Sequence, residues 1–192
     1  MQFVVGSSSD LPPHFVDELA HYRHRVFIER LGWDLQTLPG VELDDFDRED
    51  TVYVIARGDH GRVVGCARLL PTTRPYLLSH VFPELLDGRP APCSERIWEL
   101  SRFAAVDLED ELASNFGTLS SPTAVALLQA CIRSAYERGA SELVTVSPLG
   151  VERLLRKAGF DARRWGKAHQ VGPHWLFACR IAVNADPACA LQ

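Results

Sequence analysis

TVYVIARGDHGRVVGCARLL, residues 51–70, is the stretch from which the fold can be worked out. Two runs of β-branched and apolar residues make up its halves, Thr51–Arg57 and Arg62–Leu70. The residues between them, Gly58-Asp59-His60-Gly61, are typical of a turn. Two such runs around a glycine-containing turn predict a β-hairpin, which would begin a sheet.

The regions on both sides of the hairpin alternate between helical and strand patterns. Before it, Phe15–Leu31 has apolar residues at a helical spacing and is followed by Gly32, a residue that often ends helices. After it, the patterns predict a strand at Ile97–Ala104, a helix from Pro122 to the stop at Gly139, a strand at Glu142–Ser147, a helix at Val151–Ala158 and a strand at Trp175–Val183. Asp34–Asp50 and Ala105–Ser121 are predicted loops. This order indicates an α/β fold with a mixed sheet and helices on both faces.

The bulk properties indicate one globular domain. No Pro/Gly/Ser-rich linker divides the 192 residues, so residues 1–192 are expected to form a single domain. Met1–Ser9 lacks a basic segment and a long apolar run, so we expect neither signal peptide nor membrane span, and a cytoplasmic protein. The net charge of -5 disfavours nucleic-acid binding. No Cys-x-x-Cys pair or histidine spacing indicates a metal, and we expect reduced thiols at the five cysteines, Cys66, Cys93, Cys131, Cys179 and Cys189.

Three segments place charges among apolar residues, where a charge needs a partner or a function. Arg23 is four residues from both Leu19 and Phe27, and therefore lies on the apolar face of the predicted helix. Strand alternation likewise puts Arg68 on the same face as Cys66.

The third segment is IWELSRFA, residues 97–104, which sets Glu99 and Arg102 among large apolar side chains. Strict alternation puts these two residues on opposite faces, so a common site would need a bulge or strand end near Leu100 or Ser101. A carboxylate-rich loop, Glu42–Asp47, precedes the hairpin.

These charges have a structural and a functional interpretation. In the structural one, Arg23 and Arg68 form buried ion pairs with Asp44 and Asp47 that hold the loop and the helix on the sheet. Stability is a weak reason for several such pairs, because replacing a whole buried pair by apolar groups is often neutral. Since three segments share the feature, the functional interpretation is favoured.

The same residues resemble the motifs of the LuxI-type autoinducer synthases, which are acyl-homoserine lactone synthases. The resemblance covers Tyr22–Phe103, and Val144–Phe160 resembles the strand and helix beside the acyl pocket of that family. The matching motifs are Arg23-x-x-x-Phe27 followed by Trp33, Glu42-x-Asp44-x-x-Asp47, Arg68 in Cys66-Ala67-Arg68-Leu69-Leu70-Pro71, Phe82, and Glu99-x-x-Arg102.

The resemblance implies a fold similar to the GCN5-related N-acetyltransferases: three α/β/α layers around a splayed, mostly antiparallel mixed sheet. It implies transfer of an acyl group, leaning toward an unsubstituted medium chain, from acyl carrier protein or acyl-CoA to the α-amine of S-adenosylmethionine. Lactonisation would then release 5′-methylthioadenosine. S-adenosylmethionine is a substrate here, so no cofactor or metal is expected. The acetyltransferase phosphate-binding pattern, Arg/Gln-x-x-Gly-x-Gly/Ala, is not present in the sequence.

The resemblance also implies roles for individual residues. S-adenosylmethionine would be bound by Arg23, Phe27, Trp33, Asp44, Asp47, Arg68, Phe82 and Arg102. The catalytic group would comprise Glu99 as the preferred base, Asp44 and Asp47 as further candidates, and Arg68 and Arg102. Backbone N–H groups near Leu100–Phe103 would form an oxyanion hole. Phe27 and Trp33 could instead pack in the protein core, and this alternative is favoured more strongly for Phe27 than for Trp33.

Two further sets concern the acyl donor. The candidates for an acyl-chain pocket are Leu100, Ser101, Phe103, Leu143, Thr145, Val146, Ser147, Leu149 and Leu155. Basic residues that would dock an acidic carrier protein are Arg153, Arg156, Lys157, Arg163, Arg164 and Lys167, although charge alone favours a solvated helix face. Two other functions stay open: an N-acetyltransferase acting on another amine, and a non-catalytic module that binds a ligand or carrier protein.

Overall fold

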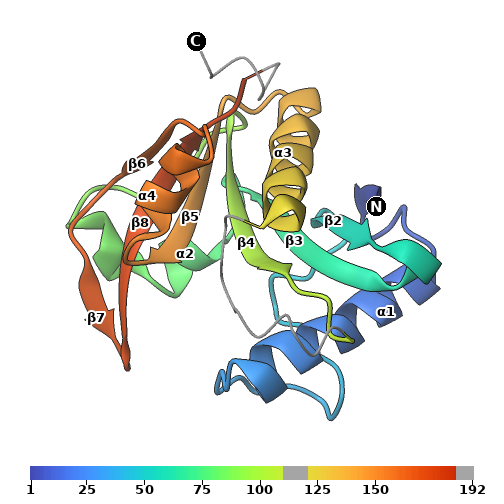
Figure 1. Cartoon of the computed structure of the whole chain (residues 1–192). Coiled ribbons are helices and arrows are strands. Elements are labelled where there is room, and N and C mark those ends of the chain that lie inside the picture. Colours follow the sequence, from blue (N-terminus) through green and yellow to red (C-terminus); the bar gives the residue numbers. More distant parts are fainter. Residues whose placement is uncertain (110–120, 185–192) are drawn as a thin grey trace. The chain divides into compact units, whose positions relative to one another are not determined.

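The predicted hairpin is present in the computed structural model, which describes residues 1–109 and 121–184 (Figure 1). Its strands are β2 (Val52–Arg57) and β3 (Val63–Pro71), and a 3-10 turn, Asp59–Gly61, connects them. The N–H of Gly58 donates to the carbonyl of Arg62 at 2.9 Å and closes the turn. The prediction of a hairpin from two β-rich runs around a glycine-containing turn is therefore confirmed.

The chain forms two compact units, each made of two separate stretches. The first unit contains Met1–Arg68 and Arg102–Leu127, and the second contains Leu69–Ser101 and the residues from Leu128 onward. Strand β3, strand β4 (Ile97–Ala105) and helix α3 (Pro122–Glu137) each continue from one unit into the other. The expectation of a single domain stays a prediction.

In the first unit the strands lie in the order β1, β2, β3, β4. Strand β1 (Gln2–Ser7) pairs antiparallel with β2, from Gln2 opposite Arg57 to Ser7 opposite Val52. This strand was not predicted. It lies at the edge of the sheet and has only a short apolar run, which produces little periodic signal.

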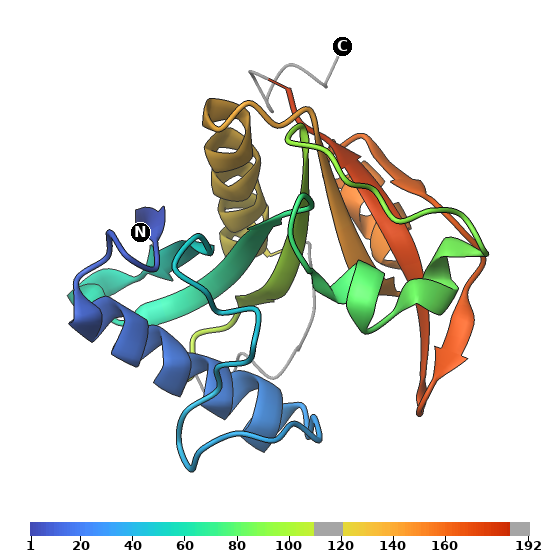
Figure 2. The ribbon, with the colours of Figure 1, turned by 180° about the vertical axis from the view of Figure 1, so that it is seen from behind.

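Helix α1 (Pro13–Arg23) continues as a π-helical stretch, His24–Arg30. The sequence predicts one regular helix here, and the π-helical turns were not expected. Gly32 follows with φ of +66°, as expected for a residue that ends a helix. Figures 1 and 2 show α1 beside the strands of the first unit. The core between them is formed by Leu11, Leu19, Tyr22, Val26, Phe27, Tyr53, Ile55, Cys66 and Ala104.

Helix α3 covers the other face of these strands. Cys66 faces the core beside α1, so the neighbouring Gly65 faces the opposite side of the sheet. A Cβ atom added at Gly65 would lie 3.3 Å from a methyl group of Leu127 and 3.1 Å from the carbonyl oxygen of Ala104. The predicted helices on both faces are thus confirmed for the first unit.

In the second unit the strand order is β4, β5, β8, β6, with β7 also paired to β8. Strand β4 pairs parallel with β5, and the other recorded pairs are antiparallel. The mixed, mostly antiparallel sheet was predicted. The elements of this unit after β4 are β5 (Glu142–Pro148), α4 (Val151–Lys157), β6 (Ala162–Arg164), β7 (His169–Val171) and β8 (His174–Ala182).

The parallel ladder between β4 and β5 is short. It begins with Ile97 opposite Glu142 and ends with Glu99 opposite Val144, although β4 continues to Ala105. The two strands thus stop pairing at Glu99, as expected for a sheet that splays at this point.

Several short elements were not predicted: helix α2 (Leu77–His80), the 3-10 turn η3 (Pro83–Leu86), and strands β6 and β7. Each has four residues or fewer, too few for a period to be recognised. The predicted loop Asp34–Asp50 contains one isolated bridge, between Leu38 and Val41. Residues 110–120 of the other predicted loop lie outside the described residues.

The cysteines that the structure describes are not in disulfide bonds. Cys66, Cys131 and Cys179 are buried and Cys93 is exposed, whereas Cys189 lies beyond the described residues. In the described part of the chain, no helix combines the length and the apolar character needed to span a membrane.

Candidate functional site

Six charged side chains meet inside the first unit. Two of them lie on faces that the sequence predicts to be apolar: Arg23 at the end of α1 and Arg68 on β3. Arg102 comes from β4, and the loop before β2 supplies the acids Glu42, Asp44 and Asp47. We call these six residues the charge ring. It contains three cations and three anions, so it is electrically balanced.

Asp47 binds both Arg23 of α1 and Arg68 of β3. Its carboxylate accepts hydrogen bonds from Nη1 and Nη2 of Arg23, at 2.7 and 3.0 Å, and Oδ2 lies 3.0 Å from Nη1 of Arg68. The hydroxyl of Tyr53 donates to Oδ1 at 2.9 Å, and the N–H of Asp44 donates to Oδ2 at 2.7 Å. Asp47 thus connects α1 to β3 through a fully bonded carboxylate.

Asp44 continues the ring. Its Oδ1 accepts from Nη1 of Arg68 at 2.6 Å and its Oδ2 accepts from Nη2 of the same residue at 3.1 Å. Oδ2 also accepts from Nη2 of Arg102 at 2.7 Å. The Asp44 side chain is 24% exposed, so it is the acid of the ring that solvent reaches most.

Glu42 closes the ring between Arg102 and Arg23. Its Oε1 accepts from Nε of Arg102 at 3.1 Å, and its Oε2 accepts from Nε of Arg23 at 2.5 Å. Glu42 was not among the predicted site residues, although it begins the Glu-x-Asp-x-x-Asp motif. Its position in that motif was the available signal. The burial of its side chain could not be recognised in a loop without a period.

Ion pairing sets the protonation states of Arg23 and Asp47. Burial alone would lower the pKa of Arg23, but Asp47 and Glu42 outweigh burial and raise it above its usual value. Burial would raise the pKa of Asp47, but Arg23 and Arg68 outweigh burial and hold it well below its usual range. Burial, and then the charge of Asp47, raises the pKa of Tyr53. Arg23 and Asp47 are therefore ionised at neutral pH, beside the protonated phenol of Tyr53.

Arg102 departs from regular strand geometry, with φ of +49°. The expected interruption of β4 is thus present, but at Arg102 itself instead of at Leu100 or Ser101. A residue other than glycine pays a conformational cost in this left-handed region, and such residues concentrate at functional sites. The carbonyl oxygen of Arg102 accepts a hydrogen bond from Sγ of Cys66 at 3.2 Å.

An aromatic pair lies next to Arg102. The rings of Phe27 and Trp33 stack with their centroids 4.7 Å apart. The Cζ atom of Arg102 lies 5.4 Å from the Trp33 ring centroid and 5.8 Å from that of Phe27. Phe27 is 2% exposed and Trp33 is 37% exposed. Phe27 thus packs in the core of the first unit, whereas Trp33 presents part of its surface to solvent.

Glu99 belongs to the second unit, where it binds the start of helix α2. Its Oε2 accepts from the N–H of Leu77 at 2.9 Å and its Oε1 accepts from the N–H of Leu78 at 2.7 Å. The carboxylate is buried and firmly held. Phe82, the other predicted binding residue of this unit, is half-buried directly before η3.

The predicted acyl-pocket residues do not share one surface. On β5, alternation places Leu143, Thr145 and Ser147 on one face and Val146 on the other. Leu149 follows this strand and is largely exposed. In the second unit, Leu100 and Leu155 are buried and Ser101 is half-buried, whereas the half-buried Phe103 belongs to the first unit.

The six predicted docking residues are all exposed and come from α4, β6 and the residues after β6. Some of them contact acids: Arg156 and Arg164 lie 3.6 and 3.4 Å from Glu152, and Arg163 lies 3.1 Å from Asp161. The surface is therefore basic with partial local neutralisation.

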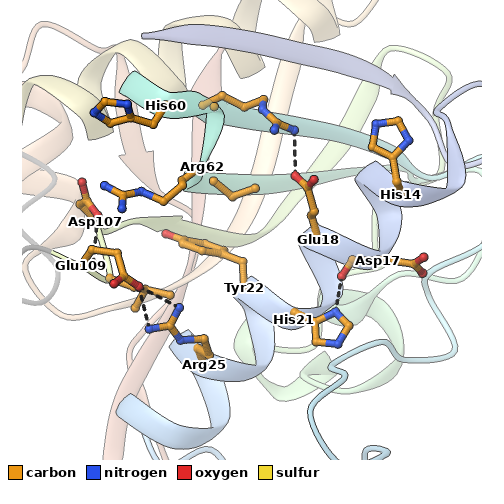
Figure 3. Close-up of a pocket in the computed structure, with 14 residues that line it drawn as sticks. His14, Asp17, Glu18, His21, Tyr22, Arg25, His60, Arg62, Asp107 and Glu109 are labelled. Atoms are coloured by element: carbon orange, nitrogen blue, oxygen red, sulfur yellow. Dashed lines mark hydrogen bonds and ion pairs between the residues drawn. The ribbon is translucent and has the colours of Figure 1, made fainter.

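A separate cleft of about 670 Å³, lined mostly by charged and histidine residues, lies in the first unit between α1 and the turn of the hairpin (Figure 3). Buried Tyr22 contributes to its lining, and its hydroxyl donates to the carbonyl of Val106 at 3.0 Å. None of the predicted site residues lines this cleft. Among residues 1–109 and 121–184, no group of three or more His, Cys, Asp or Glu side chains could hold a metal ion.

Comparisons with known proteins agree on one family. Residues 8–191 match the family model of the autoinducer synthases. An acyl-homoserine-lactone synthase of Acinetobacter nosocomialis is 47% identical over 95% of this chain and 100% of its own length.

Solved structures show the same similarity. The crystal structure of TofI in a ternary complex with an inhibitor and MTA has a TM-score of 0.84 at 42% identity, covering 100% of this chain and 96% of TofI. BjaI, a CoA-dependent acyl-homoserine lactone synthase solved with SAM and isopentyl-CoA, has a TM-score of 0.82 at 28% identity, covering 97% and 85%. An acyl-CoA N-acyltransferase from Pseudomonas aeruginosa, 14% identical with a TM-score of 0.62 over 94% and 99%, shares the fold.

Proposed function

Because the chain belongs to the autoinducer synthase family and is an acyl-homoserine-lactone synthase, we propose that it transfers an acyl group from a thioester to the α-amine of S-adenosylmethionine. The acylated product then lactonises and releases 5′-methylthioadenosine. The observation that carries this proposal is the buried charge ring beside the Phe27 and Trp33 pair. TofI bound to MTA and BjaI bound to SAM and isopentyl-CoA support the choice of substrates.

The first unit supplies groups suited to S-adenosylmethionine. Its sulfonium can pack on the exposed surface of Trp33, a cation–π contact of about 0.5 to 2 kcal/mol. Its carboxylate matches Arg102, and its amino group matches the partly exposed carboxylate of Asp44. Arg23, Arg68 and Asp47 hold these two residues in place through the ring.

The amine must lose a proton before it attacks the thioester carbonyl. Asp47 is a poor acceptor because Arg23 and Arg68 hold its pKa well below its usual range. Asp44 is contacted by two arginines, Arg68 and Arg102. Glu99 stays our preferred base, acting through a water molecule that its carboxylate, held by the N–H groups of Leu77 and Leu78, would orient.

The acyl transfer step also needs a stabilised oxyanion. We place this role on backbone N–H groups of β4 near Leu100–Phe103, directly after the ladder to β5 ends at Glu99. Lactonisation is intramolecular and its sulfonium leaving group is already activated, so it requires orientation more than a protein base. We propose that the reaction uses the two substrates, S-adenosylmethionine and the acyl thioester, without a cofactor or a metal.

For the acyl chain we propose the face of β5 that carries Leu143, Thr145 and Ser147. Ser147 lies opposite the buried Phe177 of β8, so a small polar group sits in an apolar environment. We lean toward an unsubstituted medium chain. For the donor we propose acyl carrier protein, docked on the exposed basic residues of α4 and β6, with acyl-CoA as the alternative because BjaI uses CoA thioesters.

The test is to incubate the protein with S-adenosylmethionine and matched panels of acyl carrier protein and CoA thioesters. We expect release of 5′-methylthioadenosine and a lactone identified by mass spectrometry. Glu99→Gln should lower kcat by about 10² to 10⁴, the usual range for general bases. The exposed neighbour Glu95→Gln is the matched control and should retain wild-type kcat.

Charge reversal separates the donors. Arg153→Glu combined with Arg156→Glu should raise KM for acyl carrier protein thioesters more than for CoA thioesters, whereas Arg62→Glu in the first unit should change neither. The proposal fails if no thioester yields methylthioadenosine. Turnover of acetyl-CoA without S-adenosylmethionine would instead indicate an acetyltransferase, and binding without turnover a non-catalytic module.

A further inference from the structure

Glu42 is a buried acid in the loop between the π-helical stretch and β2. Its side chain is 0% exposed. Its backbone N–H donates to the carbonyl of Ala20 in α1 at 3.1 Å, so the loop is attached to the helix at this residue. A side chain this deeply buried is shielded from solvent and does not directly contact a substrate that enters from solvent. Any effect on the reaction must pass through its partners.

Both carboxylate oxygens of Glu42 are used by arginines. Oε2 accepts from Nε of Arg23 at 2.5 Å. Oε1 accepts from Nε of Arg102 at 3.1 Å and lies 3.0 Å from Nη2 of the same residue. Because each of Asp47 and Asp44 also contacts two arginines, Glu42 completes a continuous ring of alternating charge, in the order Arg23, Asp47, Arg68, Asp44, Arg102 and Glu42.

The contact with Glu42 determines the orientation of the Arg102 guanidinium. Glu42 holds Nε and Asp44 holds Nη2, and two fixed nitrogens define the plane of this rigid group. Within the described residues, Nη1 of Arg102 has no hydrogen-bond acceptor. The group lies above the rings of Trp33 and Phe27, where that nitrogen can serve a ligand.

The backbone of Arg102 makes this support necessary. Its φ of +49° places the residue in the left-handed region, which persists only where surrounding contacts impose it. One contact is the hydrogen bond from Cys66 to the Arg102 carbonyl, and the others are the ion pairs to Glu42 and Asp44.

We infer that Glu42 is a positioning residue for the synthase reaction: it aims Nη1 of Arg102 at the carboxylate of S-adenosylmethionine. This inference rests on the proposed function, because it assumes that S-adenosylmethionine binds at Arg102. Its consequence is that Glu42 controls the affinity for the amine substrate without touching it. The acyl thioester is recognised by other groups and is independent of Glu42.

Glu42→Gln tests the inference with little change in volume. The amide presents an NH₂ group to one arginine Nε and removes the charge that holds the other. Because hydrogen bonds to charged groups contribute about 1.5 to 3 kcal/mol, KM for S-adenosylmethionine should rise about tenfold or more, with KM for the thioester unchanged. The matched control is Asp45→Asn, an exposed acid of the same loop, which should keep both values.

A double-mutant cycle separates positioning from a general structural role. If Glu42 acts through Arg102, Glu42→Gln should change KM for S-adenosylmethionine by less than about twofold in an Arg102→Ala background. A wild-type KM in folded Glu42→Gln, or an undiminished effect in that background, would overturn the inference.

A second variant covers the case in which Glu42→Gln does not fold. Glu42→Asp keeps the charge but shortens the reach, so calorimetry should show weaker binding of S-adenosylmethionine, and wild-type affinity would refute the inference. Failure of the proposed function is recognised separately, because the wild-type protein would then release no methylthioadenosine with any thioester.

Discussion

Arg23 and Asp47 form two parallel hydrogen bonds inside the first unit, Nη1 to Oδ1 at 2.7 Å and Nη2 to Oδ2 at 3.0 Å. Their side chains are 1% and 3% exposed. A bidentate pair of this kind orients both groups, and neither partner can be removed without leaving a buried charge. This pair therefore attaches the acidic loop to helix α1.

Removing one partner should destabilise the protein strongly. Asp47→Asn removes one buried anionic partner from both Arg23 and Arg68, while Glu42 still contacts Arg23 and Asp44 still contacts Arg68. We expect the free energy of unfolding to fall by about 3 to 5 kcal/mol, measured by urea denaturation. Asp45→Asn, at an exposed position of the same loop, should change it by less than about 0.5 kcal/mol. An equal effect of the two substitutions on the free energy of unfolding would contradict the claim that the buried pair of Arg23 and Asp47 stabilises the fold.

The same carboxylate predicts how stability depends on pH. Burial would raise the pKa of Asp47, but Arg23 and Arg68 outweigh burial and lower it. A folded-state pKa below the unfolded value, about 3.9, means that this stabilisation is complete above the unfolded pKa and lost as pH falls toward the folded pKa. The difference in Tm between wild type and Asp47→Asn should therefore shrink as pH falls from about 5 to about 2. A constant difference over this range would show that the pair does not shift the pKa.

The stacked aromatic residues should respond differently to substitution. Phe27→Ala removes a buried ring, so we expect a loss of stability of about 3 to 5 kcal/mol. Trp33→Ala should cost less stability, because part of its ring is already exposed, but should weaken binding of S-adenosylmethionine by about 0.5 to 2 kcal/mol. Thermal denaturation and calorimetry measure the two effects. Unchanged affinity in Trp33→Ala would remove this residue from the proposed binding surface.

The backbone at Arg102 allows a comparison of two substitutions that both remove the guanidinium. Glycine adopts positive φ without the steric cost that a Cβ atom imposes. Arg102→Gly should therefore be more stable than Arg102→Ala by about 1 kcal/mol, contrary to the usual order within a strand. Both variants should have equally weak binding of S-adenosylmethionine. Lower stability of the glycine variant would show that φ at this position is not strained.

The elements that the sequence predicted well are those long enough to show a clear pattern of apolar or turn residues. The hairpin follows from two β-rich runs around a turn, and the start of α3 follows from Pro122 at the first helical position. The buried face of α1 follows from apolar residues three to four positions apart. The π-helical stretch His24–Arg30 has almost the same apolar spacing as an α-helix, so the pattern does not distinguish the two. Strand β1 and helix α2 are too short or too polar to produce a period.

The site divides in the same way. Periodicity showed that Arg23 and Arg68 lie on apolar faces, because face follows directly from local geometry. Asp44 and Asp47 were correctly named as their partners, but Glu42 was missed and the pairing was not specified. Arg23 binds Asp47 and Glu42, and Arg68 binds Asp44 and Asp47. Loop residues have no regular apolar spacing, so the burial of Glu42 could not be predicted from the sequence. Its place in a motif was the only indication of a role.

The sequence by itself determined the class of fold, the apolar faces that carry two arginines and the family to which the chain belongs, because local spacing and motif order are properties of neighbouring residues. Only the tertiary structure decided that Glu42 joins Arg23 to Arg102, which are 79 positions apart by residue number, and that Arg102 adopts a left-handed backbone. Contacts between distant residues depend on how elements pack and on which carboxylate reaches each guanidinium in the interior. Local spacing does not contain that information.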